Sequence, residues 1–241
     1  MKKLFLISAG LLLTTAVWSQ NCYTIKSSVK MEGLPEEYAG FAESEKTIFI
    51  KDNKTKTETT SMMMSQVEVF DGKMMTVITE AMGNKTGWSA TKEELEKGGN
   101  DDAKKDEPKP KFENTAEKKM IAGYECVKTI VTLSGVGKEK VEMKITIWHT
   151  DKIKKPEGAT GGPKSKRRSG NSFDFKEISG YPMQVEFQTN QQGMDLKYIE
   201  TVSEVTTDKL EDGTFTVSTE GYKMMTYAEM KEMNKKQMEG E

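Results

Sequence analysis

Residues that commonly act in catalysis or metal binding, histidine and cysteine, are scarce in this chain. Its 241 residues include one histidine, His149, and two cysteines, Cys22 and Cys126. A histidine base needs a nucleophile beside it, and a histidine metal ligand usually has companions. Neither accompanies His149, so we expect a surface or turn residue at a strand end. Without a convergent set of nucleophile, base and metal ligands, the sequence predicts a protein that is not an enzyme and has no cofactor.

An excess of charge of one sign is also absent. The chain has 36 Lys and Arg against 38 Asp and Glu, a formal net charge of −2. This balance gives no electrostatic basis for binding nucleic acid. One basic run, Lys164–Arg168, lies in the glycine- and proline-containing segment Lys152–Ser172. Such a run can contact anionic lipid headgroups, but a solvated flexible loop is the favoured interpretation.

Long apolar runs are missing except at the start. Two lysines precede the apolar run Leu4–Val17, and the residues up to Ser19 suit a cleavage site. This pattern predicts a signal peptide over residues 1–19, cleaved near Ser19, and it is too short for a membrane span. An uncleaved anchor and lipidation at Cys22 are less favoured alternatives. We therefore expect a periplasmic or secreted protein with no transmembrane segment in the mature chain.

The two cysteines have no metal-ligand spacing. In an oxidising compartment such a pair predicts a disulfide between Cys22 and Cys126. The bridge would close a loop of about 100 residues and stabilise the fold by roughly 2–5 kcal/mol. The alternative is a buried, unreactive thiol at Cys126 and a free one at Cys22, which lies near a terminus that can fray.

What the chain has in quantity is alternation of apolar and polar residues at period two. About ten short strands separated by turn signals predict a mainly β fold, a large curved antiparallel sheet or open half-barrel with a few short helices. The clearest strands lie around Val141–Trp148 and Tyr181–Gln188. The residues expected to line a concave face and to bind an apolar ligand are Val141, Met143, Ile145, Ile147, Met183, Val185 and Phe187.

Domain organisation follows from one charged segment. Asn100–Lys111 contains two prolines and almost no apolar residue, which predicts a linker. The predicted organisation is a single β-rich domain over residues 20–225, with halves at 20–99 and 112–225 joined by the linker 100–111, and a C-terminal helix and tail at 226–241.

Three local patterns make finer predictions. Thr91 and Glu94 have the spacing of a capping box at a short helix. The threonine-rich strand Lys54–Thr60 suits a solvated face or a sheet edge. The apolar residues change register between Tyr198 and Ile199, which predicts a bulge.

Methionine is abundant, with 17 residues, and Met62, Met63 and Met64 are consecutive. Clustered thioethers can bind Cu(I), whereas methionine also lines deformable apolar surfaces. Successive residues of a strand point to opposite faces, so three adjacent methionines converge on one metal only if they lie in a loop. We therefore favour lining of a core or ligand groove over copper, and we expect no metal site.

Several short motifs occur in a familiar order. They are Met120–Cys126, Ile147–Asp151, Ile178–Val185, Glu204–Thr207 and Glu220–Met225. Together they resemble the secreted domain-of-unknown-function family forty-four-twelve, which is similar to the outer-membrane lipoprotein carriers of the LolA/LolB type. The resemblance implies an open antiparallel half-barrel that holds helices in its concave face. It assigns no catalytic residues, and it implies handling of apolar ligands or lipoproteins in the Gram-negative cell envelope.

The sequence thus predicts an exported, non-enzymatic protein that binds a lipid or a lipoprotein acyl chain in a concave sheet. Two alternatives stay open. One is a structural or interaction module of the cell envelope with no small ligand, and the other is methionine-based copper binding.

Overall fold

The computed structural model describes residues 22–98, 110–136, 141–154, 177–191 and 194–239. The expected signal peptide, nearly all of the expected linker and the basic run Lys164–Arg168 lie outside these residues. Of the helices in the described part, none is long and apolar enough to cross a membrane.

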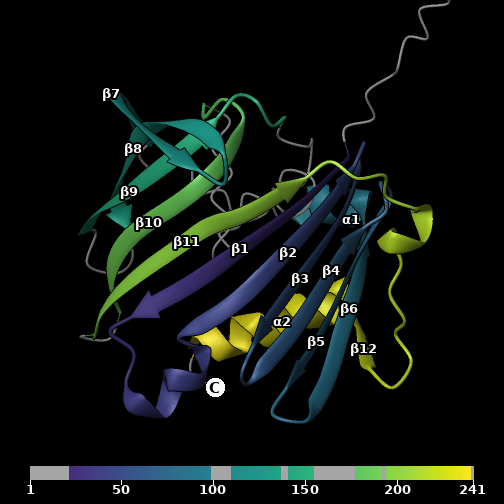
Figure 1. The fold of residues 1–241 in the computed structure, drawn as a ribbon. Coiled ribbons are helices and arrows are strands. Elements are labelled where there is room, and N and C mark those ends of the chain that lie inside the picture. The colour runs from purple at the N-terminus through teal and green to yellow at the C-terminus, as the bar shows by residue number, and fades with distance from the viewer. Residues whose placement is uncertain (1–21, 99–109, 137–140, 155–176, 192–193, 240–241) are drawn as a thin grey trace, which may run out of the picture.

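Six strands come from the first half of the chain and six from the second (Figure 1). The first six are β1 (Cys22–Glu32), β2 (Glu43–Lys51), β3 (Lys54–Ser61), β4 (Met64–Phe70), β5 (Met74–Ala81) and β6 (Asn84–Thr91). The others are β7 (Lys111–Ile121), β8 (Tyr124–Val136), β9 (Val141–Thr150), β10 (Tyr181–Gln191), β11 (Met194–Thr206) and β12 (Lys223–Thr226). The helices are η1 (Glu36–Phe41), α1 (Lys92–Gly98), η2 (Asp212–Phe215) and α2 (Tyr227–Glu239).

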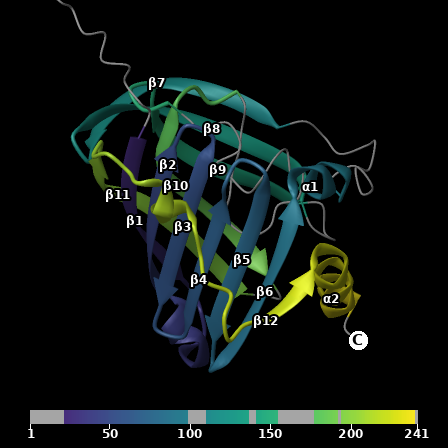
Figure 2. The same ribbon diagram turned by 90° about the vertical axis from the view of Figure 1, so that its right-hand side faces the viewer.

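All twelve strands belong to one sheet, in the order β12-β6-β5-β4-β3-β2-β1-β11-β10-β9-β8-β7. Neighbours are antiparallel except β12, which runs parallel to β6. The pairing of β1 with β11 joins the two halves of the chain. Figures 1 and 2 show a strongly curved sheet, with β7–β10 bent away from the plane of β2–β6. The predicted mainly β fold with a large curved sheet and few helices is confirmed.

Strand pairing defines an inner face of the sheet. One row across β1 to β6 consists of Ile25, Ile48, Thr57, Glu68, Val77 and Trp88. A second row across β1 and β11 to β8 consists of Val29, Glu200, Val185, Ile147 and Thr129. Leu95 of α1 and Tyr227 of α2 pack on this same face, in one apolar cluster with Val77 and Trp88. Both α-helices therefore cover the inner face beside β5 and β6.

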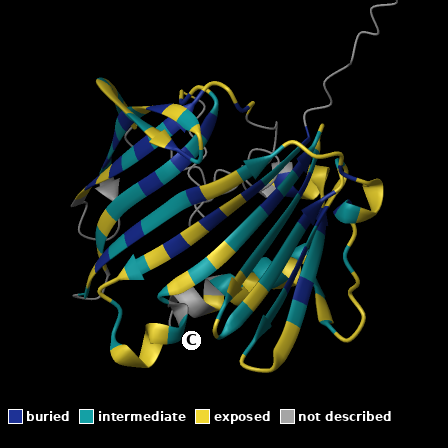
Figure 3. Ribbon diagram, viewed as in Figure 1, coloured by how far each residue is buried: buried dark blue, intermediate teal, exposed yellow. Residues whose placement is uncertain are grey.

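Buried and exposed residues alternate along many of the strands (Figure 3). The central inner cluster draws on β1, β2, β7, β8, β10 and β11, so it connects both halves of the chain. A second inner cluster contains Val131, Ile145, Ile147 and Val185 of β8, β9 and β10. The apolar inner face of the second half thus continues into the first half at β1 and β2.

The expected disulfide is not formed, and Cys22 and Cys126 are separate buried thiols. Cys22 packs with Val69 and Phe215 under η2, on the outer face of the sheet. Cys126 belongs to the central inner cluster. The two thiols belong to separate apolar clusters. Their spacing in the sequence could not predict this separation.

Two further predictions need correction. The strand β3 is neither an edge nor fully solvated, because it lies between β2 and β4 and its Thr55 is buried. Threonine also suits interior strands, since its branched side chain packs on a pleated surface. The bulge in β11 occurs at Ser203 and not at Tyr198, because Lys26 pairs with Glu204 and Ser27 with Val202.

The edge strand β7 has no counterpart among the predicted strands. Most of its residues are exposed, and they do not alternate regularly with buried ones. Its pairing with β8 is also interrupted between Asn114 and Lys118. An edge strand faces solvent on more sides and needs no apolar periodicity, so pattern reasoning passed over it.

Candidate ligand-binding site

The apolar part of the inner face is built mainly on β9 and β10. Pairing places Ile147 beside Val185 and Ile145 beside Phe187. Ile145, Ile147 and Val185 are buried, whereas Phe187 is partly buried and stacks on Tyr198 at 4.9 Å between ring centroids. The branched residues of these strands favour the extended conformation, and alternation turns them all to one side.

The expected lining residues divide between two clusters. Met143, Ile145, Ile147, Val185 and Phe187 come together in the cluster on β8 to β10. Met183 instead joins the central cluster with Tyr181 and Val202. Val141 begins β9, but its side chain lies outside the described residues. The structure therefore brings five of these side chains into one cluster and places a sixth in the adjoining one.

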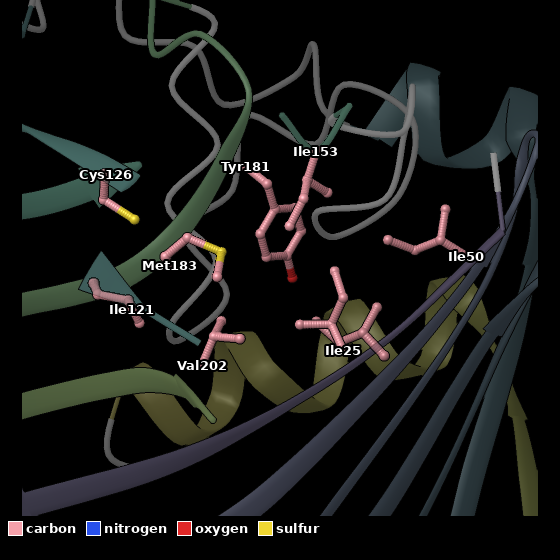
Figure 4. Packing of buried hydrophobic residues seen from close by; sticks show 9 residues of the cluster. Ile25, Ile50, Ile121, Cys126, Ile153, Tyr181, Met183 and Val202 are labelled. Atoms are coloured by element: carbon pink, nitrogen blue, oxygen red, sulfur yellow. The ribbon is translucent and has the colours of Figure 1, made fainter. Parts of the chain in front are cut away.

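Figure 4 shows the central cluster, where Tyr181 and Met183 approach Ile25 across the curve of the sheet. Ile153, which follows β9, completes this group and is fully buried. Burial raises the pKa of Tyr181 well above its ordinary value, because the phenolate would lose its hydration. Tyr181 is therefore a neutral, apolar contributor to the face.

A charged group interrupts this apolar face, and sequence reasoning missed it. Glu200 of β11 points inward, and its Oε1 lies 2.9 Å from Lys46 Nζ of β2. Ser27 Oγ donates to the same oxygen at 3.2 Å, and Tyr198 Oη donates to Oε2 at 2.8 Å. We call Glu200, Lys46, Ser27 and Tyr198 the Glu200 cluster.

The Glu200 cluster holds its carboxylate ionised. Burial acts to raise the pKa of Glu200, but the Lys46 ammonium and the three hydrogen bonds outweigh it, and the pKa is lowered. The phenol of Tyr198 has a raised pKa, first because of burial and then because of the Glu200 charge. A carboxylate with all these donors is a weak base, so the cluster is structural rather than catalytic.

Polar side chains continue from Lys46 toward β4 and β5. Glu68 lies in the inner row, accepts a 2.6 Å hydrogen bond from Gln66 Nε2, and has its pKa raised by burial. Thr79 Oγ1 lies 3.5 Å from Gln66 Oε1. The inner face is thus apolar on β8 to β10 and polar in part on β2 to β5. This division matches a ligand with an apolar and a polar end.

His149 is not the surface or turn residue that its position suggested. It lies within β9 with 5% of its surface exposed. Its Nδ1 donates to the Ser179 carbonyl at 2.9 Å, and Nε2 lies 2.9 Å from Thr129 Oγ1. Burial lowers the pKa of His149. Both ring nitrogens are engaged, so the imidazole ties β8 and β9 to the segment before β10.

The methionine triplet lies away from the inner clusters, at the β3–β4 turn. Met62, Met63 and Met64 line a shallow pocket of about 450 Å³ together with Met82 of the β5–β6 turn. Met62 is 89% exposed and Met82 is 68% exposed. Met62 is therefore not a core residue, although it lines this pocket with Met63 and Met64. In the described part of the chain, no group of three or more His, Cys, Asp or Glu residues suits a metal ion.

No protein-family model matches this chain. No curated protein matches it either. The family suggested by the motifs therefore stays an expectation.

Solved structures provide distant likenesses. PNGF-II has 16% identity and a TM-score of 0.43 over 88% of this chain, which spans only 32% of that protein. The lipoprotein LppX of Mycobacterium tuberculosis has 9% identity and a TM-score of 0.37, covering 78% of this chain and 88% of LppX. A LolA-superfamily protein of Nitrosomonas europaea has 12% identity and a TM-score of 0.33, covering 82% and 91% of the two chains. All three TM-scores are below 0.5, so these similarities do not indicate a function for this chain.

Proposed function

We propose that this protein is an exported, non-enzymatic binding protein for an amphipathic ligand, a lipid or a lipoprotein acyl chain, on the inner face of its sheet. In this proposal residues 20–225 form one binding domain, followed by the helix and tail at 226–241. Export to the periplasm or the cell exterior is inferred from the signal-peptide pattern of residues 1–19.

The observation that carries the proposal is the continuous apolar stretch of the inner face. The second inner cluster, with Ile145, Ile147 and Val185, adjoins the central cluster around Met183 and Tyr181. The strands that carry these residues, β9 and β10, are neighbours in one curved sheet (Figure 2). Each methylene of an acyl chain buried there contributes about 0.8 kcal/mol. Methionine at position 183 also adapts its shape to a flexible chain.

The polar groups of the inner face support a binder rather than an enzyme. Glu200 is held by Lys46, Ser27 and Tyr198, and both ring nitrogens of His149 are engaged. General-base catalysis needs a group within hydrogen-bond reach of the proton it removes. Here the strongest candidates for that role already have protein partners.

The test begins with the full-length protein expressed with export and purified without detergent. Lipid extraction followed by mass spectrometry should detect a co-purifying acyl lipid. A fluorescent fatty acid should then bind the delipidated protein and be displaced by the extracted lipid. If no lipid is recovered and the probe does not bind, the proposal is wrong.

A matched pair of variants locates the site. Phe187 is partly buried on the inner face, and the next residue, Gln188, is exposed. Phe187→Glu should abolish probe binding, because it places a charge among apolar side chains. Gln188→Glu adds the same charge to the same strand on the other face and should bind normally. Equal loss in both variants, or loss in neither, would reject this location.

A further inference from the structure

Two neighbouring hairpin turns bring four methionines to one place. The strand β4 pairs with both β3 and β5, so the β3–β4 turn lies beside the β5–β6 turn. The backbone N–H of Met82 donates to the Met63 carbonyl at 3.4 Å, which ties one turn to the other. The pocket between them is lined by Met62, Met63, Met64 and Met82 with Ser61, Ser65, Glu80 and Gly83.

The geometric objection to convergence of the triplet does not apply in this structure. Met62 and Met63 follow the end of β3 and precede β4, so they lie in a turn and not in a strand. Ser61 Oγ accepts hydrogen bonds from the backbone N–H of Met63 and Met64, at 3.4 and 3.1 Å. This side-chain turn releases Met62 and Met63 from strand alternation, whereas Met64 begins β4 and pairs with Ala81.

Met82 occupies a backbone position that disfavours its side chain. Its φ is 49°, in the left-handed region, and Gly83 follows with φ 78°. Hairpin turns of this kind prefer Asn, Asp or Gly at the first position, and a bulky residue there is uncommon. Met82 thus combines a strained backbone with an exposed side chain that lines the same pocket as the triplet, which motivates a functional hypothesis.

The Met63 side chain packs against η1. A Cβ atom added to Gly40 of η1 would lie 2.7 Å from Met63 Sδ. The absence of a side chain at Gly40 therefore leaves the space that the thioether occupies. Glu80 also lines the pocket and carries a negative charge, with Lys85 Nζ 3.1 Å from its carboxylate.

We propose that this pocket is a binding site for a soft monovalent metal ion, Cu(I) or Ag(I), with thioether sulfurs of Met62, Met63, Met64 and Met82 as ligands. Thioethers are soft and neutral, which selects Cu(I) over hard or borderline cations. They have no proton to lose, so binding persists at a pH where histidine and cysteine sites fail. This site is separate from the inner face proposed to hold lipid.

The first experiment titrates the full-length protein with Cu(I) under anaerobic conditions against a colorimetric Cu(I) chelator, at pH 7 and pH 5. The expected result is one ion per chain, retained at both values, with no competition from Zn²⁺. Failure to retain Cu(I) against the chelator, or displacement by Zn²⁺, would overturn the proposal.

The second experiment locates the ion. With methyl-labelled methionine, Ag(I) should shift the NMR signals of the four pocket methionines. Met63→Leu and Met82→Leu conserve side-chain volume, and each should weaken Cu(I) binding by at least about 10-fold, the lower bound for losing a residue that merely supports a metal ligand. Met120→Leu, at another exposed methionine on β7, is the control and should bind as the wild type does. Shifts confined to other methionines, or equal weakening by Met120→Leu, would contradict the site.

Discussion

Lys46 of β2 and Glu200 of β11 form an ion pair of 2.9 Å that bridges the intervening strand β1. Their side chains are only 20% and 14% exposed. The pair connects the two halves of the chain where β1 and β11 join them in one sheet. It therefore serves as a sensitive probe of how the halves are held together.

Removing one partner of this pair should be severely destabilising. Lys46→Met leaves the Glu200 carboxylate buried without its cation, and we expect a loss of about 3–5 kcal/mol in the free energy of unfolding. Chemical denaturation measures this loss. The matched control is Lys26→Met, because Lys26 pairs with Glu204 on neighbouring strands but both side chains are about half exposed. That variant should lose at most about 1 kcal/mol.

Replacing both partners should restore much of the stability. In Lys46→Met with Glu200→Leu no buried charge is left uncompensated, and apolar substitutes for a buried ion pair are often neutral or better. A double variant less stable than Lys46→Met alone would contradict the assignment of that cost to the orphaned carboxylate.

The dependence of stability on acid pH offers a second measurement of the Glu200 contribution. Because the pKa of Glu200 is lowered on folding, its contribution is present above the unfolded pKa of about 4.3 and is lost as pH falls through the folded value.

The single histidine permits a clean pH measurement. Burial lowers the pKa of His149, so the unfolded chain binds its proton more readily than the folded chain does. The free energy of unfolding should therefore fall as pH decreases below the unfolded pKa of about 6.5, by at most about 1.4 kcal/mol per pH unit. NMR titration of the imidazole should give a pKa below 6.5. The fall between pH 7 and pH 5 should be smaller in His149→Gln than in the wild type, and a titration of the imidazole above 6.5 would refute the prediction.

Gly180 should tolerate no side chain. Its φ is +71°, and a Cβ there would lie 1.9 Å from the Thr150 carbonyl oxygen. Gly123 is the control, since its φ is +84° but nothing lies within 4 Å of a Cβ. Gly123→Ala should lose only the left-handed backbone cost of about 1–2 kcal/mol. Gly180→Ala should lose clearly more, because the backbone must move, and equal melting temperatures would disprove the close approach.

The capping box at α1 predicts a smaller effect. The Thr91 backbone N–H and hydroxyl both donate to Glu94 Oε2, at 2.8 and 2.9 Å, and the Glu94 N–H lies 3.2 Å from Thr91 Oγ1. Thr91→Ala should reduce the free energy of unfolding by about 1 kcal/mol. Thr91→Ser keeps the hydroxyl and should behave as the wild type. Equal loss in both variants would assign the effect to β6 rather than to the cap.

Sequence patterns anticipated much of the local structure. The α1 capping box and most of the strands are where turn signals and alternation placed them. The bulge was predicted near Tyr198, which is wrong, because that prediction followed the positions of the apolar residues alone. With Glu200 directed inward, residues 194–202 keep one register, and the bulge falls at Ser203. A charged residue can be predicted to face solvent only if no partner for it lies in the interior of the fold. The partner of Glu200 is Lys46, which is 154 residues away in the chain, so no local pattern indicates it.

The amino-acid sequence by itself determined the class of the fold, the positions of most strands and the first helix cap, because these depend on residues a few positions apart. Only the tertiary structure decided that Cys22 and Cys126 lie in separate clusters, that Glu200 meets Lys46, and that Met82 joins the methionine triplet. Each of these outcomes depends on which strands pair and in what register. Strand pairing and register depend on burying the apolar residues of the whole sheet together, so a local pattern of residues cannot determine them.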